Sequence, residues 1–188
     1  MKYAITKDSL VKVINSCVNA INRSFNDTVT VDFDNSTANQ FAHVELNVTK
    51  NILGNIIGAA SNRNISINLD YMLSFINLVS VSTREWMYKD IVKFVLLHEY
   101  RHIMQCDIRF FNGMSGLACL NGYSNPGLLP EEKDADEWAF KVSKISPSLY
   151  KIIRGGHVSD TIMIAEGYEG LRKYSSVISS MLYSFNIM

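Results

Sequence analysis

The residues best suited to chemistry lie together in the segment His98-Glu99-Tyr100-Arg101-His102, which has the pattern His-Glu-x-x-His. Residues four apart lie one turn apart on the same face of a helix, so the imidazoles of His98 and His102 can converge on one ion. Zn²⁺ favours such nitrogen ligands. Glu99 lies about 100° around the helix from His98, beside the ion rather than on it, which suits a general base for a metal-activated water. The pattern therefore predicts a catalytic zinc centre.

A long helix is expected to carry this motif. Ser82 and Glu85 form a capping box, and neither Pro nor Gly interrupts the chain from there until Gly113. The helix is predicted to lie within residues 82–110 and to end near Cys106 or a few residues beyond. Two of the four histidines of the chain fall in the motif, so a chance match is a weak explanation. The stronger competing interpretation is a helix whose two histidines are satisfied by ordinary hydrogen bonds. The apolar residues that would bury this helix are Trp86, Ile91, Phe94, Val95 and Leu97.

A hydrolytic zinc site also requires a third protein ligand and an open position for water. Several carboxylates occur in residues 131–136, where a second amphipathic helix is predicted to start at Pro130 and to be ended by Pro147. Acidic residues also stabilise a helix N-terminus through the helix dipole, so this cluster has a structural interpretation too. Helical periodicity alone favours Glu131 as the ligand, because Glu131 lies nearer than Glu132 to the centre of the apolar face. That face contains Ala135, Trp138 and Val142.

Taken together, these residues resemble the zincin metallopeptidases, specifically the gluzincin group and its small single-domain members. In that group the third ligand is a glutamate on a helix after the active-site helix, often in the string Glu-x-x-Ala-Asp. The matching string here spans residues 132–136. The resemblance therefore implies Glu132 as the third zinc ligand and Asp136 as a carboxylate that orients a ligand histidine. Periodicity and resemblance thus disagree, and Glu131 remains the alternative.

The resemblance also implies an α+β, zincin-like fold, in which a small twisted sheet packs on the active-site helix. Apolar spacing predicts a first helix at residues 10–25, and alternation at period two predicts strands at 29–33, 42–48 and 65–69. Residues 52–60 fit either a strand or a short helix. In the family an edge strand holds an extended peptide across the cleft, and the strand at 65–69 is the expected edge.

The length of 188 residues favours one domain. Its expected parts are an N-terminal helix and sheet in residues 1–81, the active-site helix in 82–110, a loop in 111–129, and the glutamate helix with C-terminal helices in 130–188, the last of them near 171–185.

Together these features predict a zinc-dependent peptidase. In this interpretation His98, His102 and Glu132 hold Zn²⁺, and Glu99 acts as general base and then as general acid. The alternative is a catalytically silent, zinc-stabilised binding or regulatory protein, which would have no need of a general base. His157 follows two glycines and is the candidate donor to the oxyanion, with a structural histidine as the competing interpretation. Four other residues with suitable side chains are more typical of packing or surface positions: Tyr123, Tyr150, Tyr168 and His43. Arg101, inside the motif, is expected to pair with an acidic neighbour.

Composition limits the partners and the location. Eighteen Lys plus Arg balance eighteen Asp plus Glu without a basic patch, which argues against a nucleic acid or an anionic membrane as partner. No stretch approaches the roughly 18 apolar residues of a membrane span, and the first residues do not form a secretory apolar segment. Three cysteines far apart, without a Cys-x-x-Cys pair, fit free thiols in a reducing compartment. We therefore expect a cytoplasmic protein that acts on a protein or peptide substrate.

Overall fold

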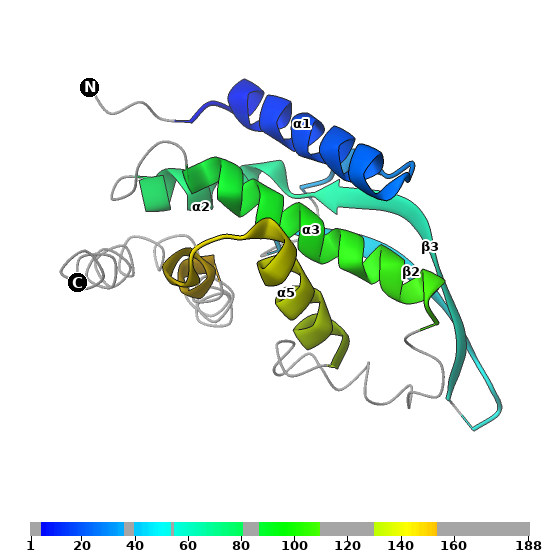
Figure 1. Ribbon diagram of the computed structural model, residues 1–188. Coiled ribbons are helices and arrows are strands. Elements are labelled where there is room, and N and C mark those ends of the chain that lie inside the picture. The colour runs from blue at the N-terminus through cyan, green and yellow to red at the C-terminus, as the bar shows by residue number, and fades with distance from the viewer. Residues whose placement is uncertain (1–4, 36–39, 54, 81–86, 110–129, 154–188) are drawn as a thin grey trace, which may run out of the picture.

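The computed structural model describes residues 5–35, 40–53, 55–80, 87–109 and 130–153 of the chain. Its elements, in chain order, are α1 (Lys7–Phe25), β1 (Thr30–Phe33), β2 (Ala42–Lys50), β3 (Ile56–Ile67), α2 (Leu69–Ser80), α3 (Met87–Asp107) and α5 (Pro130–Ser143), followed by helical residues 147–153. The architecture is α+β, as predicted. Figure 1 shows α3 running across the sheet, with α1 along one side of it and α5 along the other.

The first helix covers one side of α3 with an apolar stripe. Its N-terminus is capped by Thr6, whose side chain accepts a hydrogen bond from the backbone N–H of Ser9 at 3.2 Å. It ends at Phe25, and the following Asn26 adopts the left-handed conformation typical of helix ends (φ 52°). The stripe recurs at three- and four-residue spacing, which confirms the predicted amphipathic helix. Its buried members are Leu10, Ile14, Val18 and Ile21.

The sheet has three strands in the order β1-β3-β2, so β3 is the central strand. β1 pairs with β3 in parallel, whereas β2 and β3 form an antiparallel hairpin. The expectation that residues 65–69 form the sheet edge is therefore wrong, because β1 and β2 flank this strand on both sides. Residues 56–60, which fitted either a strand or a helix, form the first part of β3.

The helix α2 was not predicted, and it begins where the last strand was expected to continue. Leu69 belongs to α2 rather than to β3. The preceding Asn68 caps this helix, because its side-chain oxygen accepts a hydrogen bond from the backbone N–H of Tyr71 at 3.0 Å. Leu69 therefore extends the alternating apolar pattern of the strand, although it belongs to the helix.

The motif helix α3 lies at the centre of the packing. It contacts α1, α2, α5, β2 and β3, and residues on most of its sides are buried, including Ile91, Val92, Leu96 and Ile103. Such a helix holds its side chains in fixed places, because neighbours surround it. α3 ends at Asp107, close to the predicted end; the capping box at Ser82 lies outside the described residues.

The helix α5 begins at Pro130, as predicted, since proline is favoured at the first helical position. Ala135 and Ala139 are fully buried, and these small side chains let α5 approach α3 closely. α5 ends at Ser143, before Pro147, which opens the next helical residues. The predicted loop at 111–129 and the helix near 171–185 lie outside the described residues. Among the described helices, none is long and apolar enough to cross a membrane.

Candidate metal centre

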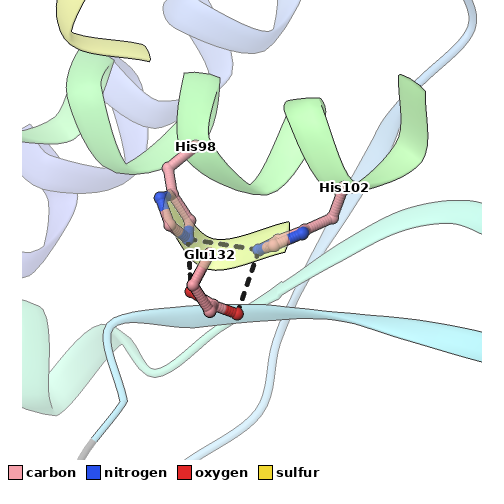
Figure 2. A group of neighbouring side chains, drawn as sticks. All are labelled: His98, His102 and Glu132. Carbon is pink, nitrogen blue, oxygen red and sulfur yellow. Dashed lines mark hydrogen bonds and ion pairs between the residues drawn. The ribbon is translucent and has the colours of Figure 1, made fainter. Parts of the chain in front are cut away.

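The two histidines of the motif and one glutamate of α5 meet at the interface between the two helices. Nε2 of His98 lies 3.2 Å from Nε2 of His102 and 3.2 Å from Oε2 of Glu132. Nε2 of His102 lies 3.4 Å from Oε1 of Glu132. Figure 2 shows both Nε2 atoms turned toward each other and toward the carboxylate. The sequence-predicted ligands are therefore brought together in space.

The dimensions and chemistry of this cluster fit Zn²⁺. Four ligands at about 2.0–2.1 Å in a tetrahedron lie about 3.3–3.4 Å from one another. The separations of 3.2, 3.2 and 3.4 Å in the cluster are close to that value. Two imidazole nitrogens and a carboxylate are a set of donors that zinc accepts, and three protein ligands leave one position open. His98, His102 and Glu132 can therefore hold this ion.

The outer nitrogens of both rings face hydrogen-bond acceptors. Nδ1 of His98 lies 3.0 Å from Oδ1 of Asp136, and Nδ1 of His102 lies 2.8 Å from Oε1 of Gln105. Because both partners accept, both Nδ1 atoms carry hydrogen, and in neutral rings the Nε2 lone pairs point into the cluster. Two lone pairs and a carboxylate at such short range repel one another unless a cation or a proton lies among them.

The pKa values of the three cluster residues show that protons can take the position of a cation between them. Burial lowers the pKa of His98, but hydrogen bonds with Asp136 and Glu132 outweigh it and raise this pKa to about 10. Burial lowers the pKa of His102, but its hydrogen bond with Glu132 and the negative charges of Glu99 and Glu132 together raise it. Burial raises the pKa of Glu132, yet the two histidines hold it well below its usual range. A divalent ion at this site must therefore displace protons.

Glu99 lies beside the cluster without being part of it. It follows His98 on α3 and is only 8% exposed, and its negative charge raises the pKa of both His98 and His102. This placement next to the ligands, on the same helix, is what a general base requires.

The two glutamates at the start of α5 have different positions. Glu132 faces the histidines, whereas Glu131 is buried and its backbone carbonyl accepts a hydrogen bond from Gln105 at 2.8 Å. Helical periodicity placed Glu131 on the buried face of α5, and Glu131 is buried, but the carboxylate that faces the histidines is that of Glu132, at the edge of this face. Asp136, one turn after Glu132, contacts His98 as the resemblance implied.

The remaining candidates fall into two groups. Tyr150 packs its ring against those of Phe94 and Phe140, with centroids 5.6 and 4.9 Å away, which is a packing role. His43 lies half-buried on β2. The other candidates lie outside the described residues: His157, Tyr123 and Tyr168.

Gln105 was missed in the sequence, although it contacts His102. Its signal was a polar residue three positions after His102, which places it on the same side of the helix. Arg101 does pair with an acidic neighbour: its Nε and Nη2 donate to Asp134 at 2.8 and 3.2 Å.

Comparison with known proteins adds no relative. No protein-family model, curated protein or solved structure shows a significant match to this chain.

Proposed function

We propose that this chain is a zinc-dependent peptidase of zincin-like fold. One observation carries the proposal: His98, His102 and Glu132 converge within 3.2–3.4 Å, with Glu99 next to them on the same helix. The α+β architecture, with the motif helix packed on a small sheet, agrees with this function. A purely structural zinc site would not require the buried carboxylate of Glu99.

The chemistry is divided between the ion and the protein. When bound, Zn²⁺ would supply the Lewis acidity that activates water and polarises the substrate carbonyl. The Glu99 carboxylate takes a proton from the attacking water, whose oxygen bonds to the carbonyl carbon. When the carbon–nitrogen bond breaks, Glu99 delivers this proton to the leaving nitrogen, so the same residue serves as base and then as acid. Asp136 holds the His98 ring in place by accepting from Nδ1.

An extended peptide would be held by an edge strand, and packing against the motif helix favours β2 for this role. Of the two edges, β2 packs against the motif helix α3, whereas β1 packs against α1. A substrate added beside β2 gains backbone hydrogen bonds that do not depend on its side chains. A protein or peptide substrate is therefore the class that this arrangement favours.

The test compares wild type with Glu99→Gln in two measurements, zinc content and cleavage of an unfolded, fluorescently labelled protein. The variant should bind zinc like wild type and lose at least about 100-fold in kcat/KM, because general acid–base catalysis contributes that much. Glu137→Gln is the matched control, since Glu137 lies on α5 with a side chain that is 69% exposed. Equal cleavage by wild type and Glu99→Gln would remove the proposed base. Zinc binding without any cleavage by wild type would favour the silent binding protein instead.

A further inference from the structure

Gln105 connects a histidine of the centre to the helix that carries the glutamate. Its side chain is fully buried. The amide oxygen accepts from Nδ1 of His102 at 2.8 Å. The amide nitrogen donates to the backbone carbonyl of Glu131 at 2.8 Å and to Oδ2 of Asp134 at 2.9 Å. Every hydrogen-bonding group of this amide except one oxygen lone pair therefore has a partner.

The partners of the nitrogen fix which way the amide points. A backbone carbonyl and a carboxylate accept hydrogen bonds, so both must face the NH₂ group, and the oxygen must face His102. An amide oxygen cannot donate. His102 is thereby restricted to the form with hydrogen on Nδ1, and its Nε2 is directed at the cluster.

The same amide also positions the start of α5. It binds the carbonyl of Glu131, the residue directly before Glu132, and one short side chain thus fixes a histidine and the backbone beside the glutamate. Asp134 is itself held by Arg101, which donates to both of its oxygens at 2.8 and 3.2 Å. The guanidinium of Arg101 lies over the ring of Trp138 on α5, 5.6 Å from its centroid.

We propose that Gln105 is a positioning residue of the metal centre, which sets the tautomer of His102 and the placement of Glu132 together. This inference rests on the zinc site of the proposed function, but not on peptide cleavage. The carboxylate of Asp136 does the corresponding work for His98, so the two rings are held by different partners, one charged and one neutral.

The experiment measures zinc affinity by chelator competition in wild type and in Gln105→Met, whose unbranched side chain has a similar volume. Affinity should fall about 10- to 100-fold, the usual effect of removing a group that orients a metal ligand. Long-range ¹H–¹⁵N spectra of the zinc-loaded proteins give a second readout. Wild type should show hydrogen on Nδ1 of both rings, and in the variant the His102 signal should change while the His98 signal does not.

The control is Asn22→Leu, which removes a half-buried amide far from the cluster in sequence. Asn22 binds both backbone groups of Val29, at 2.8 and 2.9 Å, and belongs to α1. This variant should lose stability and keep its zinc affinity. A second test variant, Asp134→Asn, has a partly exposed side chain and should lose affinity in the same direction but less than Gln105→Met.

The outcomes separate the two proposals. Unchanged zinc affinity in Gln105→Met and Asp134→Asn, or an equal loss in Asn22→Leu, would overturn the role of Gln105 while leaving the peptidase proposal standing. Wild type that binds no zinc would overturn both. A selective loss in the two test variants supports the role even if no peptide is cleaved.

Discussion

Replacing Glu132 by Gln should abolish most of the stabilisation expected from the proposed zinc ion. Glu132 supplies the only carboxylate of the three-residue cluster, and it comes from α5, whereas both histidines come from α3. An ion held by all three residues ties the two helices together, and it binds the folded chain far better than the unfolded one. Zinc should therefore raise the melting temperature, and Glu132→Gln should remove that rise.

The size of the effect follows from mass action. At free zinc of about 100 times Kd, binding stabilises the folded state by about 2.7 kcal/mol. In a chain of this size 1 kcal/mol shifts the melting temperature by about 2–4 °C, so wild type should gain about 5–11 °C. Loss of one ligand should weaken affinity at least about 100-fold, more than loss of an orienting group. At the same free zinc, the variant then gains about 0.4 kcal/mol, or about 1 °C.

The assay is thermal unfolding of each protein with and without chelator-buffered zinc. Each variant is compared with itself, so a change in the metal-free stability cancels. Glu131→Gln is the matched control, because Glu131 is the adjacent glutamate and its carboxylate lies outside the cluster. It should keep the full zinc increment. An increment that survives in Glu132→Gln, or that disappears in Glu131→Gln, would refute the assignment of the third ligand.

Three further predictions concern pH and packing. Zinc affinity should fall as pH falls, because His98, with its pKa raised to about 10, carries a proton that the ion must displace. Calorimetry at pH 7 in buffers of different ionisation enthalpy should detect the release of protons when zinc binds. Zinc binding without proton release would contradict this prediction. Asp27→Asn should lower the free energy of unfolding by about 2 kcal/mol at pH 7, since Asp27 accepts hydrogen bonds from Arg63 and Tyr100. The hydrogen bond with Arg63 lowers the pKa of Asp27, so this stability is fully present above about pH 4 and is lost as pH falls through the lower folded-state pKa. In urea unfolding, the difference between wild type and Asp27→Asn should therefore be smaller at pH 3 than at pH 7. Ala139→Leu should lower the free energy of unfolding by about 1–3 kcal/mol, because the larger side chain forces α5 away from α3. The variant should also bind zinc more weakly. Unchanged zinc affinity would show that this alanine does not set the spacing of the two helices.

The parts of the fold that were predictable are those governed by local signals. The spacing of Leu10 to Ile21 marked α1, the alternation of apolar residues marked the strands, and Pro130 marked the start of α5. The order of the strands was not predictable, because it depends on which distant segments pair, and β3 inserts between β1 and β2. The helix α2 was missed because Leu69 extends the strand pattern by one apolar residue, while the capping bond of Asn68 leaves no mark in periodicity.

The site was predictable where its residues share one helix. His98, Glu99 and His102 follow from helical geometry alone. The site residues on α5 could not be predicted in this way, because their positions depend on how α5 packs against α3. The apolar face with Ala135 and Ala139 meets α3, whereas the cluster lies at the margin of that face. This is why periodicity indicated Glu131 and why the resemblance was needed to indicate Glu132. Spacing on α3 could place Gln105 beside His102, but its contact with α5 depends on how the two helices pack and could not be predicted from one helix.

The most direct measurement is anomalous diffraction at the zinc edge from crystals of the zinc-loaded protein. We predict one peak about 2.0–2.1 Å from Nε2 of His98, Nε2 of His102 and a carboxylate oxygen of Glu132. A map without a peak between these three side chains, or a structure in which they point apart, would contradict the metal centre and the peptidase with it.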